Sequence, residues 1–220
     1  MHRWLVWLMI PAALASAAAV AQSGTQAYVI DAAASDVHWL VYRAGAFARF
    51  GHNHVISVAE VNGTVAVDPS SLARSSFELE IPVMDLVVDD PVLREALGEE
   101  FSSEPSADDI AGTHGNMLSD RVLDAERHPS IRVTGTGPVG EAGRQTLRMT
   151  VHLLGRAVEL TVPTTVTLQG DRLEAAGEFE LTHEQLGMEP FSVMGGALQV
   201  GNRMSFEYRI TAHRAAASGR

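Results

Sequence analysis

The sequence predicts an all-β protein, an eight-stranded antiparallel barrel with a short helical insert near the barrel mouth. About eight segments alternate apolar and polar residues over short runs bounded by Gly, Pro, Asn and Asp, which is typical of half-buried antiparallel strands. The pattern is interrupted once, between Asp89 and Pro129, by residues at helical spacing. The later connections are too short for parallel crossovers, which need about a dozen residues. A barrel of this size has room for one small ligand, so we expect function to lie in its interior and at its mouth.

The first segment, residues 1–21, has the features of a secretory signal. It has a short cationic start, an apolar core and a small-x-small cleavage site at Ala19-Val20-Ala21. The mature chain is therefore expected to begin at Gln22, and residues 22–220 to form one domain. An uncleaved anchor is the alternative, although Pro11 and the many alanines make a poor spanning helix. No later segment approaches the ~18 apolar residues that cross a bilayer, so we expect a periplasmic or secreted protein.

Composition excludes several classes of function. There is no cysteine, so a disulfide framework, a thiolate metal site and a cysteine nucleophile are impossible. Every basic residue except histidine is arginine, and without Arg3 the remaining 15 arginines face 27 carboxylates, a formal charge of −12. Because such a surface repels phosphate backbones, we expect no nucleic-acid partner.

The expected strands follow one another between turn signals. The clearest alternation places Leu147, Met149 and Val151 on one face, and Met204, Phe206 and Tyr208 on another. The segment that precedes the insert has Phe77, Leu79, Ile81 and Val83 on one face, opposite Ser76, Glu78 and Glu80. The full set is Val37–Arg43, Val55–Asp68 with a break near Asn62-Gly63, Ser75 to about Val88, Ile131–Gly137, Arg144–Leu154, Ala157–Leu168, Arg172–Leu181 and Val200–Ala212.

The insert is expected to contain two short helices. Asp90 can cap the orphan amides of the first, and Pro91 is tolerated at its first position. A second helix is expected from about Ala107 to Leu118, and His128-Pro129 returns the chain to extended geometry.

Histidines provide the first candidate site. If Gly51-His52-Asn53-His54 is extended, His52 and His54 point to the same face, within reach of one metal ion or one polar headgroup. A metal site would need a third ligand, for which the candidates are His114, His128, Asp85 and Glu126. A structural turn with solvated histidines is the third interpretation. His38, His152, His183 and His213 have no partner in the sequence and are interpreted as structural.

Apolar residues provide the second candidate site. Inward-facing strand residues and the apolar residues of the insert could enclose an extended apolar chain, although an ordinary filled core would show the same pattern. The candidate ligand-binding residues are Trp39, Val41, Phe50, His52, His54, Phe77, Leu79, Ile81, Leu93, Leu97, Phe101, His114, Met117, Leu118, Leu123, His128, Met149 and Phe206.

Catalytic signatures are missing from the sequence. It contains no G-x-S-x-G elbow, no H-E-x-x-H pair and no Gly-rich phosphate loop after a strand. Glu178 and Glu180 share a strand face, but alternate carboxylates on such a face are usually solvated. We therefore expect no enzymatic activity and no catalytic residue.

Several short motifs, in this order and spacing, resemble those of the YceI family of secreted, lipocalin-like proteins. The resemblance implies an extended antiparallel barrel that binds a polyisoprenoid or similar long-chain amphiphile, with no enzymatic role firmly attached. Two features depart from the family pattern: His128 replaces an aromatic residue, and Gly51-His52-Asn53-His54 is additional. The motifs are Tyr28-Val29-Ile30-Asp31 with Ser35-Asp36-Val37, Gly63-Thr64-Val65-Ala66-Val67-Asp68-Pro69, Leu123-Asp124-Ala125-Glu126-Arg127-His128-Pro129-Ser130-Ile131, Val151-His152-Leu153-Leu154-Gly155-Arg156, Leu186-Gly187-Met188 and Gly196-Ala197-Leu198-Gln199-Val200, followed by the final strand.

These observations lead to one main hypothesis and two alternatives. The main hypothesis is an exported carrier for an isoprenoid or quinone-like lipid, with the tail in the barrel and the polar end near His52 and His54, and with His114 or His128 as further candidates for contact with the polar end. This hypothesis requires no cofactor. The ligand would come from a membrane that the protein contacts transiently. One alternative is a periplasmic metal- or haem-binding protein that uses the two histidines, and the other is a filled barrel that binds a partner through its surface. The sequence leaves the oligomeric state open.

Overall fold

The computed structural model describes residues 24–141 and 144–216, so the predicted signal segment lies outside the described residues. Its two α-helices are α1 (Pro91–Ala96) and α2 (Ala107–Leu118). Its strands are β1 (Gln26–Ile30), β2 (Asp36–Ala44), β3 (His54–Val58), β4 (Asn62–Val67), β5 (Ser76–Pro82), β6 (Leu86–Val88), β7 (Ser130–Glu141), β8 (Arg144–Leu153), β9 (Arg156–Gln169), β10 (Arg172–Thr182), β11 (Ser192–Val193) and β12 (Leu198–Arg214). Among the described residues, no helix combines the length and the apolar character that crossing a bilayer requires.

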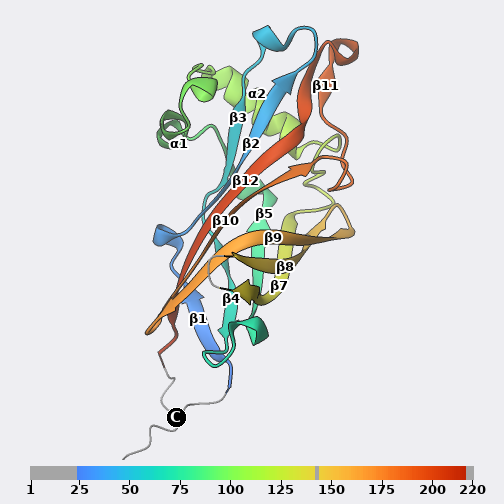
Figure 1. The fold of residues 1–220 in the computed structure, drawn as a ribbon. Coiled ribbons are helices and arrows are strands. Elements are labelled where there is room, and N and C mark those ends of the chain that lie inside the picture. The colour runs from blue at the N-terminus through green and yellow to red at the C-terminus, as the bar shows by residue number, and fades with distance from the viewer. Residues whose placement is uncertain (1–23, 142–143, 217–220) are drawn as a thin grey trace, which may run out of the picture.

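The strands form a closed antiparallel barrel, as the alternation predicts. Eight of them pair in the order β1-β4-β5-β7-β8-β9-β10-β12, and β12 returns to β1 through the pairing of residues 212–214 with residues 28–30. The long β12 also pairs with β2, which continues into β3 and β6. Beside β12, the wall is therefore built by β1 and β4 at one end of the elongated molecule and by β2 and β3 at the opposite end (Figure 1).

Two of the expected strands are interrupted. The segment expected as Val55–Asp68 is two strands, with the break at residues 59–61 just before the predicted Asn62-Gly63. The segment expected as Ser75–Val88 is divided by a 3-10 turn at Val83–Asp85 into β5 and β6. Strands β1 and β11, which are both short, were not predicted. The strand partners change at each interruption: β3 pairs with β2 and β6 whereas β4 pairs with β1 and β5, and β5 pairs with β4 and β7 whereas β6 pairs with β3.

Both helices of the insert are confirmed, because their signals are local. Asp90 Oδ1 accepts hydrogen bonds from the backbone N–H groups of Val92 and Leu93, both at 3.0 Å, and Pro91 is the first helical residue. Ser106 and Asp109 form a reciprocal capping box at the start of α2. Helix α2 lies beside β6, at the end of the barrel that also carries β11 (Figure 1).

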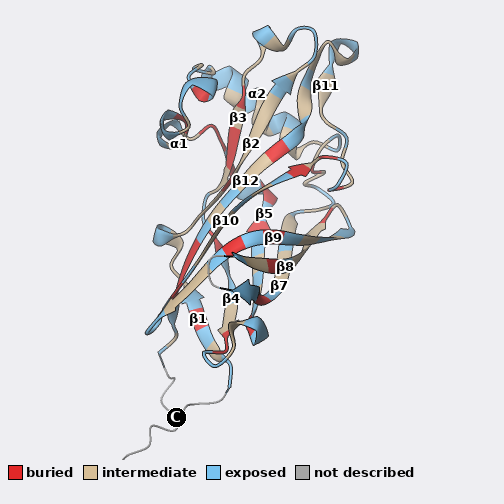
Figure 2. Cartoon of the chain, in the orientation of Figure 1, coloured by how far each residue is buried: buried red, intermediate tan, exposed pale blue. Residues whose placement is uncertain are grey.

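The barrel interior is hollow rather than uniformly packed. Figure 2 shows that buried residues are scattered along the strands among residues of intermediate burial and exposed residues. Several inward-facing residues, including Leu160, Phe179 and Phe206, belong to this intermediate class. A small cluster around Tyr28, Val67, Leu173 and Ala212 fills the barrel at the β1 end.

Candidate ligand-binding site

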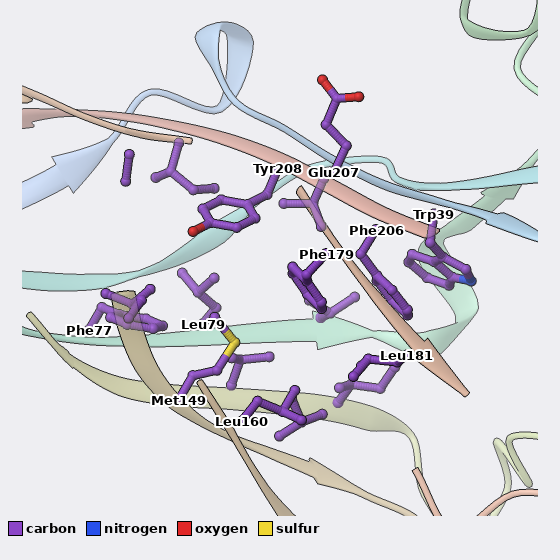
Figure 3. Close-up of a pocket in the computed structure, with 18 of the residues that line it drawn as sticks. Trp39, Phe77, Leu79, Met149, Leu160, Phe179, Leu181, Phe206, Glu207 and Tyr208 are labelled. Atoms are coloured by element: carbon purple, nitrogen blue, oxygen red, sulfur yellow. The ribbon is translucent and has the colours of Figure 1, made fainter. Parts of the chain in front are cut away.

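An apolar cavity of about 230 Å³ runs inside the barrel. We call it the inner cavity, and Figure 3 shows the side chains that point into it from several strands. The Glu207 carboxylate points away from it (Figure 3). Its lining comes mainly from β2, β5, β7, β8, β9, β10 and β12, with Leu123 and Leu186 from connecting segments. An apolar cavity of about 150 Å³ already accepts a benzene-sized guest, so this one has room for part of a hydrocarbon chain.

One wall of the inner cavity is a row of aromatic rings. Trp39 on β2 stacks on Phe206 on β12 at a centroid distance of 5.8 Å, and Phe206 stacks on Phe179 on β10 at 5.2 Å. The strand register causes this row, since Phe206 is directly opposite both Trp39 and Phe179. Each such pair contributes about 0.5–1.5 kcal/mol beyond its buried area, so the row also stabilises the wall.

Tyr208 continues the aromatic row without making it polar. Its ring lies 6.3 Å from that of Phe179, edge to face, and its hydroxyl donates a hydrogen bond of 2.8 Å to Thr164 Oγ1. Burial raises the pKa of this hydroxyl, against a smaller opposite effect of the Thr164 bond. The Tyr208 hydroxyl therefore stays neutral, and its hydrogen is bonded to the protein.

A second cavity of about 240 Å³ adjoins the first, and we call it the outer chamber. The two share Trp39, Leu123 and Met204 as a common wall. In contrast to the inner cavity, the outer chamber is lined by several polar side chains: Arg43, His52, His54, Thr113, Asn116, His183 and Gln199. An apolar compartment that adjoins a polar one fits a molecule with a hydrocarbon tail and a polar head.

His54 is the most strongly fixed polar side chain of the outer chamber. It opens β3, and its Nδ1 lies 2.6 Å from Oδ2 of Asp89, which follows β6. The pairing of β3 with β6 brings these two segments together, and the backbone N–H of Val55 also donates to Asp89 Oδ1 at 3.0 Å. His54 Nε2 lies 3.5 Å from Thr113 Oγ1 on α2.

Asp89 is buried with an arginine partner. Arg94 NH1 bonds to Asp89 Oδ1, and the guanidinium also donates to the carbonyls of Asn53, Phe101 and Ser103 at 2.8–2.9 Å. Burial alone would raise the pKa of the Asp89 carboxyl. The hydrogen bonds that the carboxylate accepts from His54, the Val55 amide and Arg94 outweigh it, so the pKa is held below its usual value. Asp89 is thus a fixed, ionised acceptor behind His54.

His52 shares the chamber but is less constrained. Its ring centroid lies 6.2 Å from that of His54, Nδ1 lies 3.2 Å from Ser103 Oγ, and Nε2 lies 4.0 Å from Asp109 Oδ2. The two histidines therefore face one compartment, as the spacing predicts. Within residues 24–141 and 144–216, no group of three histidine or carboxylate side chains is placed to hold a metal ion.

The structure brings together eleven of the eighteen predicted ligand-binding residues. The inner cavity is lined by Trp39, Phe77, Leu79, Ile81, Leu123, Met149 and Phe206, and the outer chamber adds Val41, His52, His54 and Met117. The remaining seven lie outside the linings of both cavities: Phe50, Leu93, Leu97, Phe101, His114, Leu118 and His128.

The seven residues lie elsewhere for different reasons, and two of them, His114 within α2 and His128 in the connection before β7, are partly buried outside both linings. Phe101 is buried in the core, against the Tyr42 ring at 6.2 Å and under the Arg94 guanidinium. Leu118 packs with the main core cluster. Phe50 is 66% exposed. Leu93 and Leu97 belong to the short α1 and its end.

Sequence reasoning missed other lining residues. Phe179, Leu181, Leu160 and Met204 follow the same alternation as the predicted residues, so inward-facing positions on every strand would have identified them. His183, interpreted as structural, donates a hydrogen bond of 3.0 Å from Nδ1 to the Asn202 carbonyl, and it also lines the outer chamber. Burial lowers the pKa of its imidazole.

Comparisons with known proteins place this architecture among solved structures. The family model described as the YceI-like domain matches residues 28–212. BcnA of Burkholderia cenocepacia is similar in structure, with 15% identity and a TM-score of 0.60 over 83% of this chain and 98% of that chain. A polyisoprenoid binding domain from Saccharophagus degradans, implicated in plant cell wall breakdown, has 12% identity and a TM-score of 0.56 over 86% and 99%. The Campylobacter jejuni YCEI protein has 7% identity and a TM-score of 0.51 over 73% and 85%. A comparison with curated proteins gave no match.

Proposed function

Since the chain belongs to the YceI-like family, we propose that it is an exported carrier or sequestering protein for a long-chain isoprenoid or a similar, quinone-like amphiphilic lipid. The observation on which this proposal depends is the apolar inner cavity, which shares a wall with the polar outer chamber. The polyisoprenoid binding domain from Saccharophagus degradans, which has the same fold, supports the choice of ligand class. Export is inferred from the signal features of residues 1–21.

In this proposal the tail occupies the inner cavity and the headgroup the outer chamber. Burial of hydrocarbon is favourable by about 0.8 kcal/mol for each methylene, so the tail provides most of the affinity. The polar side chains around His52 and His54 then hold the head at the chamber. This division of roles is that of most small-molecule sites, which are largely apolar with a few polar groups that fix orientation.

A membrane is the proposed source of the ligand, and two exposed loops provide the contact. Phe47 precedes one 3-10 turn and Phe50 ends it, Val193 ends β11 and Met194 begins the 3-10 turn that follows, and all four are 37–69% exposed. The Phe47 N–H donates to the Ala197 carbonyl at 2.7 Å, which ties the loops together at the end of the barrel near β11 (Figure 1). We call these four residues the apolar tip.

Charge and position favour a bilayer as the partner of the apolar tip. Residues 43–51 include Arg43 and Arg49 and no carboxylate, and residues 190–201 include no charged side chain, although the whole chain is acidic. Gly51 and Val193 also line the outer chamber, so the tip adjoins the compartment that a lipid would enter. Exposed apolar residues beside arginine are suited to the membrane interface.

Organic extraction tests the carrier proposal directly. The exported protein, purified without detergent, should yield a long-chain lipid that mass spectrometry identifies. The delipidated protein should then bind geranylgeraniol or a prenylated quinone when it is added back. Absence of any lipid in the extract, together with failure to bind either probe, would contradict the proposal.

A further inference from the structure

His54 has one ring nitrogen bound to the protein and one directed to the outer chamber. Nδ1 lies 2.6 Å from Asp89 Oδ2. Among the described residues, Nε2 has Thr113 Oγ1 as its hydrogen-bond partner, at 3.5 Å, which is the long limit for such a bond. Because both His54 and Thr113 line the chamber, Nε2 can exchange this weak partner for a group of the ligand.

The hydrogen bonds around Asp89 determine which nitrogen of His54 carries the proton. Asp89 is fully buried at its side chain and receives Arg94 and the Val55 N–H on Oδ1. An ionised carboxylate can only accept, so the short bond to Oδ2 requires a hydrogen on His54 Nδ1. In the neutral imidazole this leaves Nε2 with a lone pair and no hydrogen.

Arg94 is the cationic partner of the buried Asp89 carboxylate. Within the described residues, Asp89 is the one carboxylate in hydrogen-bond contact with His54, so this buried network already pairs one negative charge with one positive charge. The side chain of His54 is 14% exposed, so a second positive charge there would be poorly solvated. The neutral imidazole, with its hydrogen on Nδ1, presents an acceptor to the chamber.

We propose that His54 Nε2 accepts a hydrogen bond from a hydroxyl group of the ligand, so that the outer chamber selects phenol, quinol or alcohol headgroups over carbonyl or ether headgroups with the same tail. This inference rests on the proposed carrier function and specifies its headgroup. A carbonyl oxygen placed at Nε2 would set two acceptors against each other and leave both unsatisfied. A hydroxyl in the same place supplies the missing hydrogen.

His52 provides the matched control. It lines the same chamber, yet its ring contacts the Ser103 hydroxyl, and the carboxylate of Asp109 lies 4.0 Å away, beyond hydrogen-bond distance. Among the residues that the structure describes, no carboxylate lies within hydrogen-bond distance of the His52 ring, so its nitrogens can rearrange for either kind of headgroup. Removing His52 should leave the selectivity in place.

Two ligands that differ only in the hydroxyl test the proposal: para-geranylgeranylphenol and its methyl ether, measured by titration calorimetry with the delipidated full chain at about pH 8. One net hydrogen bond corresponds to an affinity ratio of about 5–10 in favour of the phenol. The H54L variant should reduce this ratio to about one by weakening phenol binding, whereas H52L and T113V should keep it.

The outcomes separate this inference from the carrier proposal. Equal binding of phenol and ether to the wild-type chain would overturn the role of His54 but leave the carrier function intact. The same conclusion would follow if the phenol-to-ether affinity ratio were unchanged in H54L, or if H52L reduced this ratio as much as H54L does. Binding of neither ligand would contradict the carrier function itself. The comparison in the wild-type chain stands even if H54L fails to fold, since it needs no variant.

Discussion

Filling the inner cavity should weaken the binding of long tails without unfolding the barrel. Ala175 on β10 lines this cavity, with its backbone paired to Ile210 and Val166. The ring introduced by Ala175→Phe would occupy the space of about four tail carbons. At about 0.8 kcal/mol for each carbon, binding should weaken by about 3 kcal/mol, on the order of 100-fold.

The neighbouring Ala176 gives a control of the same residue type. It lies on the same strand but outside the cavity lining, because successive residues of a strand face opposite sides. Calorimetric titration with geranylgeraniol should show the large loss for A175F and little change for A176F. A short probe such as isopentenol should bind both variants alike, since it does not reach the filled part. An unchanged affinity of A175F for the long probe would refute the assignment of the tail to this cavity.

Three further predictions concern the outer chamber and its surroundings. Asp89→Asn leaves a buried arginine uncompensated and should cost about 3 kcal/mol of unfolding free energy near neutral pH. Folding lowers the pKa of the Asp89 carboxyl, so the ionised carboxylate contributes its full stability at pH values above its pKa in the unfolded chain. This contribution is lost as the pH falls through the pKa of the folded state. The unfolding free energies of variant and wild type, measured in urea, should therefore converge in acid, and a constant difference would contradict the prediction. Burial lowers the pKa of His183, so the free energy of unfolding should fall as pH drops below about 6.5, where the imidazole of the unfolded chain takes up a proton. This fall should be less steep in His183→Asn. Equal slopes of unfolding free energy against pH in the two proteins would be the contrary result. Serine at both Phe50 and Met194 should slow lipid uptake from vesicles several-fold without changing affinity in detergent, while Val29→Ser, which alters an exposed residue of β1, should not; equal uptake rates would remove the role of the apolar tip.

Local signals explain why the helices and most strands could be predicted from the sequence. Asp90-Pro91 and the capping box of Ser106 specify helix starts within a few residues, and both helices lie where these signals place them. Alternation likewise predicts the inward faces of β8 and β12, including Met149 and Phe206. These features depend on neighbours in sequence, which the sequence displays.

The parts that could not be predicted depend on distant pairings. The strand β1 has five residues, and its role becomes visible only when Tyr28 is paired with Arg214. The partner of His54 is Asp89, 35 residues further along the chain. Asp89 precedes Asp90, and the role of Asp90 as a helix cap already explains the acidic residues at this position, so the sequence gives no sign of a second role. Such a contact follows from the register of β3 with β6, which no local pattern specifies.

The position of Trp39 gives the protein an intrinsic fluorescent probe. The sequence contains three tryptophans, of which Trp4 and Trp7 fall in the predicted signal segment. Trp39 is the one tryptophan among the described residues, and it stands in the wall common to both hollow compartments, stacked on Phe206. In a chain cleaved at the predicted site, emission would come from this indole alone and would report occupancy at the boundary between the two compartments.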